Sequence, residues 1–330
     1  MTKKGARVSR RMVDRGGKAH YRCRCGRRVV FFRKYEGSYL CRDCFMKSIE
    51  KRFKRTIRKH NMLRSGDRVA VSLSGGKDSS AVLYLMSKIV KPRKDMELIA
   101  IMIDEGTGEY RRKNLELAKK LCKKLGVEYH IFSFKDEFGK GMKQKVREIE
   151  KGDTKIREAC TYCGIGRRYL LNKKARELGV TKLCMGHTLD DEAQAVILNY
   201  VRGDLYRAGR MGPVTDWSLT RKKGKLFVPR IKPFREIPEK ESAIFSILAG
   251  FDLCWEKCPY AGGIRFDAKE FINNLEKKYP GIKFTILETF DKLLPHIRDF
   301  SDSREGEIVV CRKCGEPGSD EICKTCELWR

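Results

Sequence analysis

The sequence predicts an α/β fold built on a parallel sheet and flanked near both ends of the chain by small zinc ribbons. Three observations carry this prediction. Continuous apolar segments alternate with helical segments through the middle of the chain, as in parallel sheets covered by helices on both faces. A glycine-containing turn follows the first apolar segment, at the position where such sheets bind ligands. Closely spaced pairs of cysteines lie toward both ends of the 330 residues.

Length, hydrophobic content and charge narrow the class of protein. A chain of 330 residues that is 41% hydrophobic can form one large domain with small modules. No apolar run reaches the roughly eighteen residues of a membrane span, and the basic N-terminus lacks the apolar region of a secretory signal, so we expect a cytoplasmic protein without membrane contact. The net charge of +30 favours a polyanionic partner such as RNA. The alternative is a thermophile-like surface, which usually balances its charges.

The N-terminal region is predicted to be a basic arm followed by the first ribbon. We expect residues 1–20 to form a mobile arm and residues 21–46 to bind zinc, because two cysteine pairs about 15 residues apart suit tetrahedral thiolate coordination. The four candidate ligands are Cys23, Cys25, Cys41 and Cys44. The first pair has only one intervening residue, so His20 is an alternative to one of the thiolates.

A basic linker helix is expected after the ribbon, in a segment that spans residues 47–65. Apolar residues recur at helical spacing over residues 45–62, and the opposite face is rich in lysine and arginine. That face fits contact with RNA phosphates and equally fits simple exposure to solvent.

The central domain, residues 66–300, is predicted to contain four buried strands separated by helices. The strands are expected at 68–73, 98–103, 128–133 and 182–186. The helices are expected at 78–90, 110–125, 164–178, 190–202, 237–249 and 267–278. Because ligands bind at the carboxyl ends of parallel strands, the loops after the first, second and fourth strands should form the site. Two cysteines outside every set, Cys122 and Cys184, are expected in the core.

The turn after the first strand is the most informative motif. It consists of Ser74, Gly75, Gly76, Lys77, Asp78 and Ser79. The glycines let several N–H groups point into one concavity, the following helix adds the positive end of its dipole, and the lysine adds a mobile charge. The motif fits neither the Walker pattern nor Gly-x-Gly-x-x-Gly. It resembles the PP-loop of ATP-pyrophosphatases, which adenylate a carbonyl oxygen; the alternative is an ordinary strand-to-helix turn.

We therefore expect ATP at this edge of the sheet, with Mg²⁺ on the pyrophosphate and Asp78 as a candidate metal ligand. The loops after the second and fourth strands add Asp104 and His187, although a single histidine at a strand end is as often only packed. The candidate ATP-binding residues are Ser72, Ser74, Gly75, Gly76, Lys77, Asp78, Ser79, Asp104 and His187.

Cys160 and Cys163 form a Cys-x-x-Cys pair without a nearby second pair. The pair fits a redox dithiol, half of a zinc site, or two ligands of an iron–sulfur cluster. A third ligand would have to come from a distant cysteine, and the candidates are Cys254 and Cys258. Spacing alone does not separate these interpretations.

Two further Cys-x-x-Cys pairs predict the second zinc ribbon, over residues 305–330. Its candidate ligands are Cys311, Cys314, Cys323 and Cys326. Between the cysteine sets, residues 204–235 form a long basic stretch rich in glycine and proline, which we interpret as a functional loop that binds RNA. Its candidate RNA-binding residues are Arg207, Arg210, Arg221, Lys222, Lys223 and Lys225.

As a set, these motifs resemble the tRNA 2-thiouridine synthetases, the two-thiolation family within the PP-loop enzymes. The resemblance covers about residues 20–326. It includes both ribbons, the turn at Ser74–Ser79, the segment that begins Cys-Thr-Tyr-Cys-Gly-Ile-Gly-Arg-Arg, the segment Gly-His-Thr-Leu-Asp-Asp-Glu-Ala-Gln, and Lys-Cys-Pro-Tyr. It implies an adenine nucleotide alpha hydrolase-like domain and ATP-dependent sulfur transfer to C2 of a tRNA uridine, at position 34 or 54.

The resemblance also implies a [4Fe-4S] cluster on three cysteines with one iron left open. Its ligands would be Cys160, Cys163 and Cys258, and Cys254 falls outside the match. Lys77 and Asp78 would act on ATP. Asp191 matches a position proposed to act in catalysis. Arg167 is a further candidate catalytic residue and stands where members of the family can have lysine. Because a guanidinium is a poor proton donor, a general-acid role does not suit it.

Several partners follow from the same resemblance. They are tRNA, a second copy of the chain in a homodimer, and a ubiquitin-like carrier that delivers sulfur as a thiocarboxylate, with free sulfide as the alternative donor. Two other functions compete with this interpretation: a PP-loop tRNA-modifying enzyme with zinc or a redox pair at residues 160 and 163, and a non-catalytic zinc-containing RNA-binding protein. The complete Ser74–Ser79 turn argues against the second.

Overall fold

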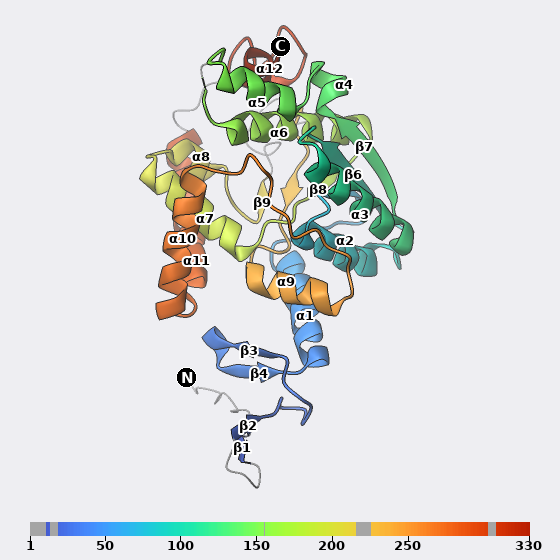
Figure 1. Ribbon diagram of the computed structural model, residues 1–330, viewed down its shortest axis with the longest axis vertical. Coiled ribbons are helices and arrows are strands. Elements are labelled where there is room, and N and C mark those ends of the chain that lie inside the picture. The colour runs from blue at the N-terminus through green and yellow to red at the C-terminus, as the bar shows by residue number, and fades with distance from the viewer. Residues whose placement is uncertain (1–10, 14–18, 155, 216–225, 303–307) are drawn as a thin grey trace.

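The computed structural model describes residues 11–13, 19–154, 156–215, 226–302 and 308–330. A sheet of six strands forms its centre (Figure 1) in the order β7-β6-β5-β8-β10-β9. All neighbours pair in parallel except β10 and β9. The strands are β5 (Arg68–Ser72), β6 (Glu97–Asp104), β7 (Glu128–Ser133), β8 (Lys182–Cys184), β9 (Val214–Thr215) and β10 (Arg230–Ile231). The four predicted strands are confirmed, whereas β9 and β10 lie in a stretch that we interpreted as a loop.

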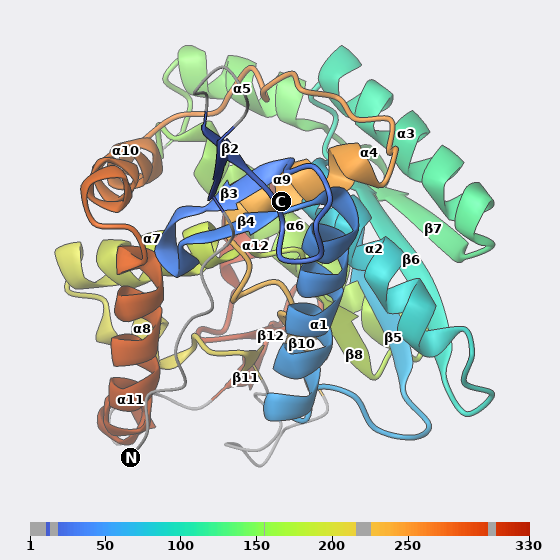
Figure 2. The same cartoon turned by 90° about the horizontal axis from the view of Figure 1, so that it is seen from below.

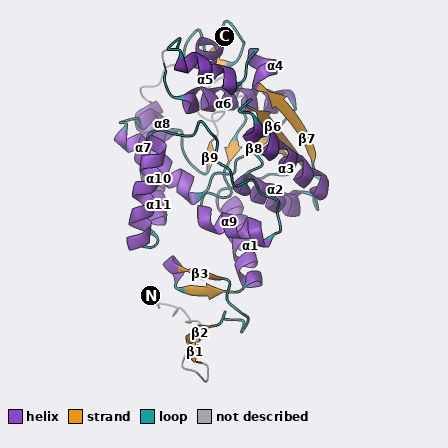
Figure 3. Cartoon of the chain, in the orientation of Figure 1, coloured by secondary structure: helices purple, strands orange, loops and turns teal. Residues whose placement is uncertain are grey.

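Helices cover both faces of this sheet (Figure 3). They are α1 (Arg42–Lys59), α2 (Lys77–Val90), α3 (Glu109–Leu125), α4 (Phe134–Phe138), α5 (Met142–Glu150), α6 (Ala159–Glu177), α7 (Leu189–Val201), α8 (Leu205–Gly209), α9 (Glu239–Leu248), α10 (Ile264–Lys278), α11 (Ile282–Asp302) and α12 (Lys324–Trp329). Two predictions need correction. Helix α6 begins five residues before the predicted 164, so both cysteines of the lone pair lie in its first turn. Helix α11, of 21 residues, was not predicted.

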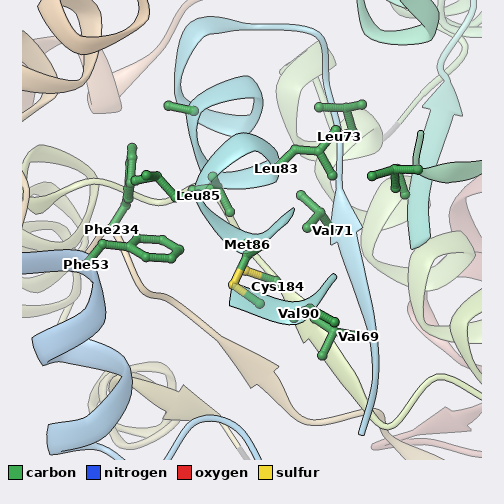
Figure 4. Packing of buried hydrophobic residues seen from close by; sticks show 14 of the residues in the cluster. Phe53, Val69, Val71, Leu73, Leu83, Leu85, Met86, Val90, Cys184 and Phe234 are labelled. Atoms are coloured by element: carbon green, nitrogen blue, oxygen red, sulfur yellow. The ribbon is translucent and has the colours of Figure 1, made fainter. Parts of the chain in front are cut away.

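The alternation of side chains along β5 separates two cores. Val69 and Val71 point into one core with α1, α2, α3 and α9, and Ala70 points into the other with α4, α5, α6 and α12. Figure 4 shows the first core, where Val69, Val71 and Leu73 pack near residues of α2. Cys122 and Cys184 are fully buried, as predicted.

In the described part of the chain, three two-stranded sheets lie toward the two ends of the molecule, two at the N-terminal end and one at the C-terminal end (Figure 1). At the N-terminal end, β1 (Arg11–Val13) pairs with β2 (Ala19–Tyr21), and β3 (Phe31–Arg33) pairs with β4 (Ser38–Leu40) across the 3-10 turn η1 (Lys34–Glu36). Part of the predicted arm is therefore a strand pair. At the C-terminal end, β11 (Val309–Val310) pairs with β12 (Pro317–Gly318) before α12.

The C-terminal ribbon packs against the central domain through α12. Trp329 is 3% exposed, and its ring packs with Phe134 and Phe138 while its Nε1–H donates to the Tyr162 carbonyl at 3.2 Å. Tyr162 lies between the two cysteines at the start of α6, so α12 helps to position that turn. Within the described ranges, no helix combines the length and the apolar character needed to cross a membrane.

Candidate functional site

The turn at Ser74–Ser79 begins where β5 ends, in the middle of the sheet. β5 lies between β6 and β8, the place where strand order reverses and where such sheets bind ligands. Gly75 has φ +83°, and a Cβ there would lie 2.1 Å from the Asn114 carbonyl oxygen, so only glycine fits. The Ser74 N–H donates to Ser79 Oγ at 3.1 Å, and that hydroxyl lies 3.1 Å from the Gly76 carbonyl. The turn is thus held in shape by its own side chains.

Lys77 and Asp78 form the first residues of α2 and pair with each other. Lys77 Nζ lies 2.9 Å from Asp78 Oδ2 and 3.0 Å from Oε1 of Glu239, the first residue of α9. Burial favours the neutral amine, but the two carboxylates outweigh it and raise the pKa of Lys77. Burial raises the pKa of Asp78 in spite of the lysine. The result is a cationic lysine next to the positive end of a helix, an arrangement that binds phosphate.

The loops after β6 and β8 reach the same edge of the sheet. Asp104 is the last residue of β6 and accepts a hydrogen bond from the Gly106 N–H at 2.9 Å, and Ser72 ends β5. His187 follows β8 and is half-buried, and its burial lowers its pKa to about 4, so the ring is neutral near pH 7. The structure therefore brings the predicted nucleotide residues of all three loops to one edge.

Asp191 lies in the first turn of α7, where it acts as part of a capping box. Its Oδ2 accepts from the Thr188 N–H at 3.0 Å and lies 2.9 Å from the Thr188 hydroxyl, and its Oδ1 is 2.8 Å from the Arg265 guanidinium. Burial favours the neutral acid, but interaction with His187, the Arg265 guanidinium and the Thr188 donors outweighs it and lowers the pKa of Asp191. The neighbouring Asp190 is used structurally, since it pairs with Lys283 and accepts from the Glu239 N–H.

The lone cysteine pair is in the first turn of α6, and Cys258 lies in the loop between α9 and α10. Cys160 Sγ lies 3.4 Å from the Tyr260 carbonyl oxygen, two residues beyond Cys258. Burial raises the pKa of Cys163 to about 12, with the nearby charges of Glu105, Cys258 and Cys160 adding to the shift and Arg167 opposing it. The two segments thus meet, although 95 residues separate Cys163 from Cys258 in the chain.

Among the described residues, Cys160, Cys163 and Cys258 do not form a group whose ligand atoms all lie within 4.8 Å of one another, unlike the two four-cysteine groups near the ends of the chain. Cys254 differs from them, because it lines a surface cavity of about 500 Å³ with Trp255 and the side chains of α3.

An ionic chain that sequence reasoning missed runs from the turn to Arg167, whose charge acts on Cys163 four residues before it on α6. Arg111 on α3 donates to the Ser74 carbonyl at 2.6 Å and lies 2.7 Å from Glu105, which is 6% exposed. Glu105 in turn lies 3.5 Å from Arg167 on α6. The loop after the second strand was expected at this edge, but nothing in the sequence indicated Arg111 or the pairing of Glu239 with Lys77.

The two four-cysteine groups have the geometry of zinc sites. Within each group, all ligand atoms lie within 4.8 Å of one another. The first group is Cys23, Cys25, Cys41 and Cys44, and the second is Cys311, Cys314, Cys323 and Cys326. The backbone N–H of Arg27 contributes most to lowering the pKa of Cys25 to about 7, which favours the thiolate that zinc binds. Cys25 is therefore the fourth member of the first cysteine group. His20, the alternative ligand, lies in β2, and its side chain is not among those that the structure describes.

The predicted RNA-binding loop is described only in part. Arg207 is exposed on α8, with Nε 3.3 Å from Asp204, and Arg210 follows the same helix. The remaining four candidates lie outside the described residues: Arg221, Lys222, Lys223 and Lys225.

Comparisons with known proteins agree with this geometry. Residues 46–212 match a family model described as a PP-loop domain. The chain is 33% identical to the tRNA 2-thiolation protein NcsA of Haloferax volcanii, over 92% of this chain and 97% of that protein. It is 32% identical to the tRNA-5-methyluridine(54) 2-sulfurtransferase of Pyrococcus horikoshii, over 92% of each. The solved U34-tRNA thiolase NcsA from Methanococcus maripaludis, with its [4Fe-4S] cluster, superposes with a TM-score of 0.76 and 33% identity, covering 93% of this chain and 94% of that one.

Proposed function

The chain belongs to the PP-loop family of tRNA 2-thiolation sulfurtransferases, and from that premise we propose that it replaces O2 of a tRNA uridine with sulfur in an ATP-dependent reaction. The observation that carries the proposal is the ionic chain from the phosphate-binding turn toward the cysteines, through Arg111, Glu105 and Arg167. This chain of contacts supports the proposal because it would couple a nucleotide site to a sulfur-binding site at one edge of one sheet. Relatives are named for uridine 34 and for uridine 54, and either position fits this proposal.

The turn would bind the phosphates of ATP and promote adenylation. Backbone N–H groups and the positive end of α2 face the place where phosphate charge develops, and Lys77 adds a cation after leaving Glu239. Uridine O2 attacks the α-phosphorus, and the bond to pyrophosphate breaks. Mg²⁺ would offset the pyrophosphate charge, with Asp78 as its protein ligand. Ser72, Asp104 and His187 would border the nucleotide.

The three cysteines would hold a [4Fe-4S] cluster. Cys160, Cys163 and Cys258 are soft sulfur donors on two segments that meet, and when bound the cluster would supply a site that presents sulfur for the reaction. Sulfide-level sulfur would add at C2 of the adenylated uridine, and AMP would leave with the former O2. Arg167 is fixed as a cation and would stabilise the neighbouring thiolates, not donate a proton.

Asp191 would act as a carboxylate. Its lowered pKa keeps it ionised near pH 7, so it suits accepting a proton or orienting the uridine more than donating a proton. Arg265 fixes its orientation from α10.

The remaining parts bind and support the tRNA. The domains of this proposal are a basic arm (1–20), a first ribbon (21–46), a linker helix (47–65), the catalytic domain (66–300) and a second ribbon (305–330). Each ribbon would hold one structural Zn²⁺. The protein would work in the cytoplasm as a homodimer, and it would receive sulfur from a thiocarboxylate carrier or as free sulfide.

The direct test is to map 2-thiouridine in tRNA from a strain that lacks the gene. Loss of 2-thiouridine at position 34 or 54, restored by the wild-type gene and not by a Cys258→Ala variant, is the expected result. An unchanged content at both positions would contradict the proposal. Anaerobic purification adds a second readout, since a colourless protein without iron would favour zinc or a redox pair at residues 160 and 163.

A further inference from the structure

The two faces of the β3–β4 pair in the N-terminal ribbon differ in what they contact. Successive residues of β3 point to opposite faces. Phe31 packs edge-on against Phe45 of α1 with ring centres 5.1 Å apart, and Arg33, 3% exposed, pairs with Glu241 of α9. Phe32, between them, points the other way. The inner face therefore attaches the ribbon to the body of the protein and leaves the outer face exposed.

The outer face consists of three stacked aromatic rings. Phe32 is paired across the strands with Tyr39, with ring centres 4.4 Å apart. Tyr21, at the end of β2, stacks on the same tyrosine at 4.1 Å with the ring planes 2° apart. The two outer members of this Tyr21–Tyr39–Phe32 stack are 41% and 40% exposed. The planes of Phe32 and Tyr39 are 26° apart, and rings at this exposure on a small module leave apolar surface in contact with water.

The surroundings of the stack are strongly basic. Residues 21–44 contain seven arginines and lysines against two acidic residues. Arg24, Arg28 and Lys34 are exposed beside the strands. A purely apolar protein partner would not suit this charge, whereas a nucleic acid offers phosphates for the cations and flat bases for the rings.

We propose that the Tyr21–Tyr39–Phe32 stack is a platform on which an unpaired base of the substrate tRNA stacks. This inference rests on the proposed function, since it assumes that tRNA is the partner. Proteins recognise single-stranded loops of RNA by stacking splayed bases on aromatic side chains, and the paired bases of an A-form helix are not accessible in that way. The platform therefore binds a loop of the tRNA and not a helical stem.

The inner face gives this platform a fixed position relative to the ATP site. Figure 2, seen from below, shows β3 and β4 in front of α9, and Figure 1 shows them below the same helix. Arg33 Nη2 lies 2.5 Å from Glu241 on α9, and the first residue of that helix, Glu239, pairs with Lys77 of the phosphate-binding turn. A base held on the ribbon is thus held at a defined distance from the ATP site.

The test compares two leucine variants in binding to an unmodified tRNA transcript and to an RNA duplex without unpaired bases. The double variant Phe32→Leu/Tyr39→Leu keeps apolar bulk and loses both rings. The control is Phe271→Leu on α10, which removes a ring that is 56% exposed. We expect the double variant to weaken tRNA binding about fivefold or more, the low end for loss of one stacked base, with the control near wild type.

Salt dependence and the duplex separate stacking from charge. The double variant should keep the wild-type slope of log affinity against log salt, because that slope counts phosphate contacts. It should also bind the duplex as tightly as wild type and retain zinc. Unchanged tRNA affinity, or an equal loss for tRNA and duplex, would overturn the inference. A change in oligomeric state with unchanged tRNA affinity would instead make the stack an interface between two copies.

A second variant keeps the test independent of ribbon stability. Phe32→Trp preserves the ring, so zinc content and tRNA affinity should match or exceed wild type, and its fluorescence should be quenched by tRNA beyond the change seen in wild type. No added quenching would refute the platform. Failure of wild-type protein to bind tRNA or to support thiolation would refute the proposed function, which is a separate outcome.

Discussion

Replacing Glu241 by glutamine should loosen the attachment between the N-terminal ribbon and the ATP site. The Glu241 carboxylate is 1% exposed and accepts from Arg33 at 3.1 and 2.5 Å and from the Tyr35 hydroxyl. Glutamine has nearly the same shape, but it leaves the Arg33 guanidinium buried with less compensating charge. A further carboxylate, Glu36, lies 3.0 Å from Arg33 and remains.

The expected magnitude follows from this geometry. Breaking a buried ion pair by removing one partner costs about 3–5 kcal/mol. Because Glu36 and the glutamine oxygen retain part of the pairing, we expect about 2 kcal/mol, which corresponds to a roughly thirtyfold increase in local opening. Glu236→Gln is the matched control. Glu236 precedes α9 and faces Arg55, Lys59 and His60; because Arg55 and Lys59 are 61% and 56% exposed and can be solvated, its loss should cost less than the loss of Glu241.

Hydrogen exchange of the backbone amides in α9 is the assay. Exchange should accelerate about thirtyfold in Glu241→Gln and only a few-fold in Glu236→Gln. Because Ser246 of the same helix lies 3.0 Å from the Lys77 carbonyl oxygen, we also expect weaker ATP binding in Glu241→Gln alone. Equal exchange and equal ATP affinity in the two variants would refute the argument that α9 connects the ribbon to the ATP site.

Four further outcomes are expected. Lys77→Ala should abolish ATP-dependent thiolation while iron content stays at the wild-type level; unchanged ATP turnover would exclude the phosphate role of the turn. Asp191→Asn should destabilise the protein at neutral pH. The difference in stability from wild type should shrink as the pH falls through the lowered pKa of Asp191, because the carboxylate stabilises the fold only when it is ionised. Thermal melts that show the same difference at every pH would contradict this. Cys311→Ser should lower zinc content from about two to about one per chain and reduce stability, as measured by metal analysis and melting; wild-type protein with less than about one zinc per chain would disprove both ribbons. Replacing the four basic loop residues together by alanine should flatten the salt dependence of tRNA binding and weaken all tRNAs alike, whereas a wild-type slope in a filter-binding series would mean that the loop is only solvated. These residues are Arg221, Lys222, Lys223 and Lys225.

The parts of the fold that were predictable have strong local signals. β5 and β6 contain continuous apolar runs because both of their faces are covered, whereas β7 is an edge strand without a fully buried residue, and the glycine turn is encoded within six residues. The strands β9 and β10 have two residues each, too few for any periodic pattern. Helix α11 contains Pro295, which argues against a helix locally, and it is held by tertiary packing of Leu287, Phe290 and Leu294.

The start of α6 and the ionic contacts of the site could not be predicted from local sequence. The helix was predicted to begin at residue 164, whereas α6 begins at Ala159; within it, a Cβ on Gly166 would lie 3.0 Å from the Phe134 ring, so close packing requires that glycine. Lys77 and Glu239 pair although they are 162 positions apart in the sequence, and Arg167 and Glu105 are 62 positions apart. Such contacts depend on the arrangement of whole helices on the sheet.

The central claim, ATP-dependent sulfur transfer that depends on three cysteines, is tested most directly in a reconstituted anaerobic reaction. The measurement is 2-thiouridine formed in a tRNA transcript, together with AMP released, for wild type and for the matched variants Cys258→Ala and Cys254→Ala. The account predicts one AMP for each 2-thiouridine in wild type, little loss in Cys254→Ala, and no product in Cys258→Ala although that protein is folded. Product formed without ATP, or full activity in Cys258→Ala with loss in Cys254→Ala, would contradict it.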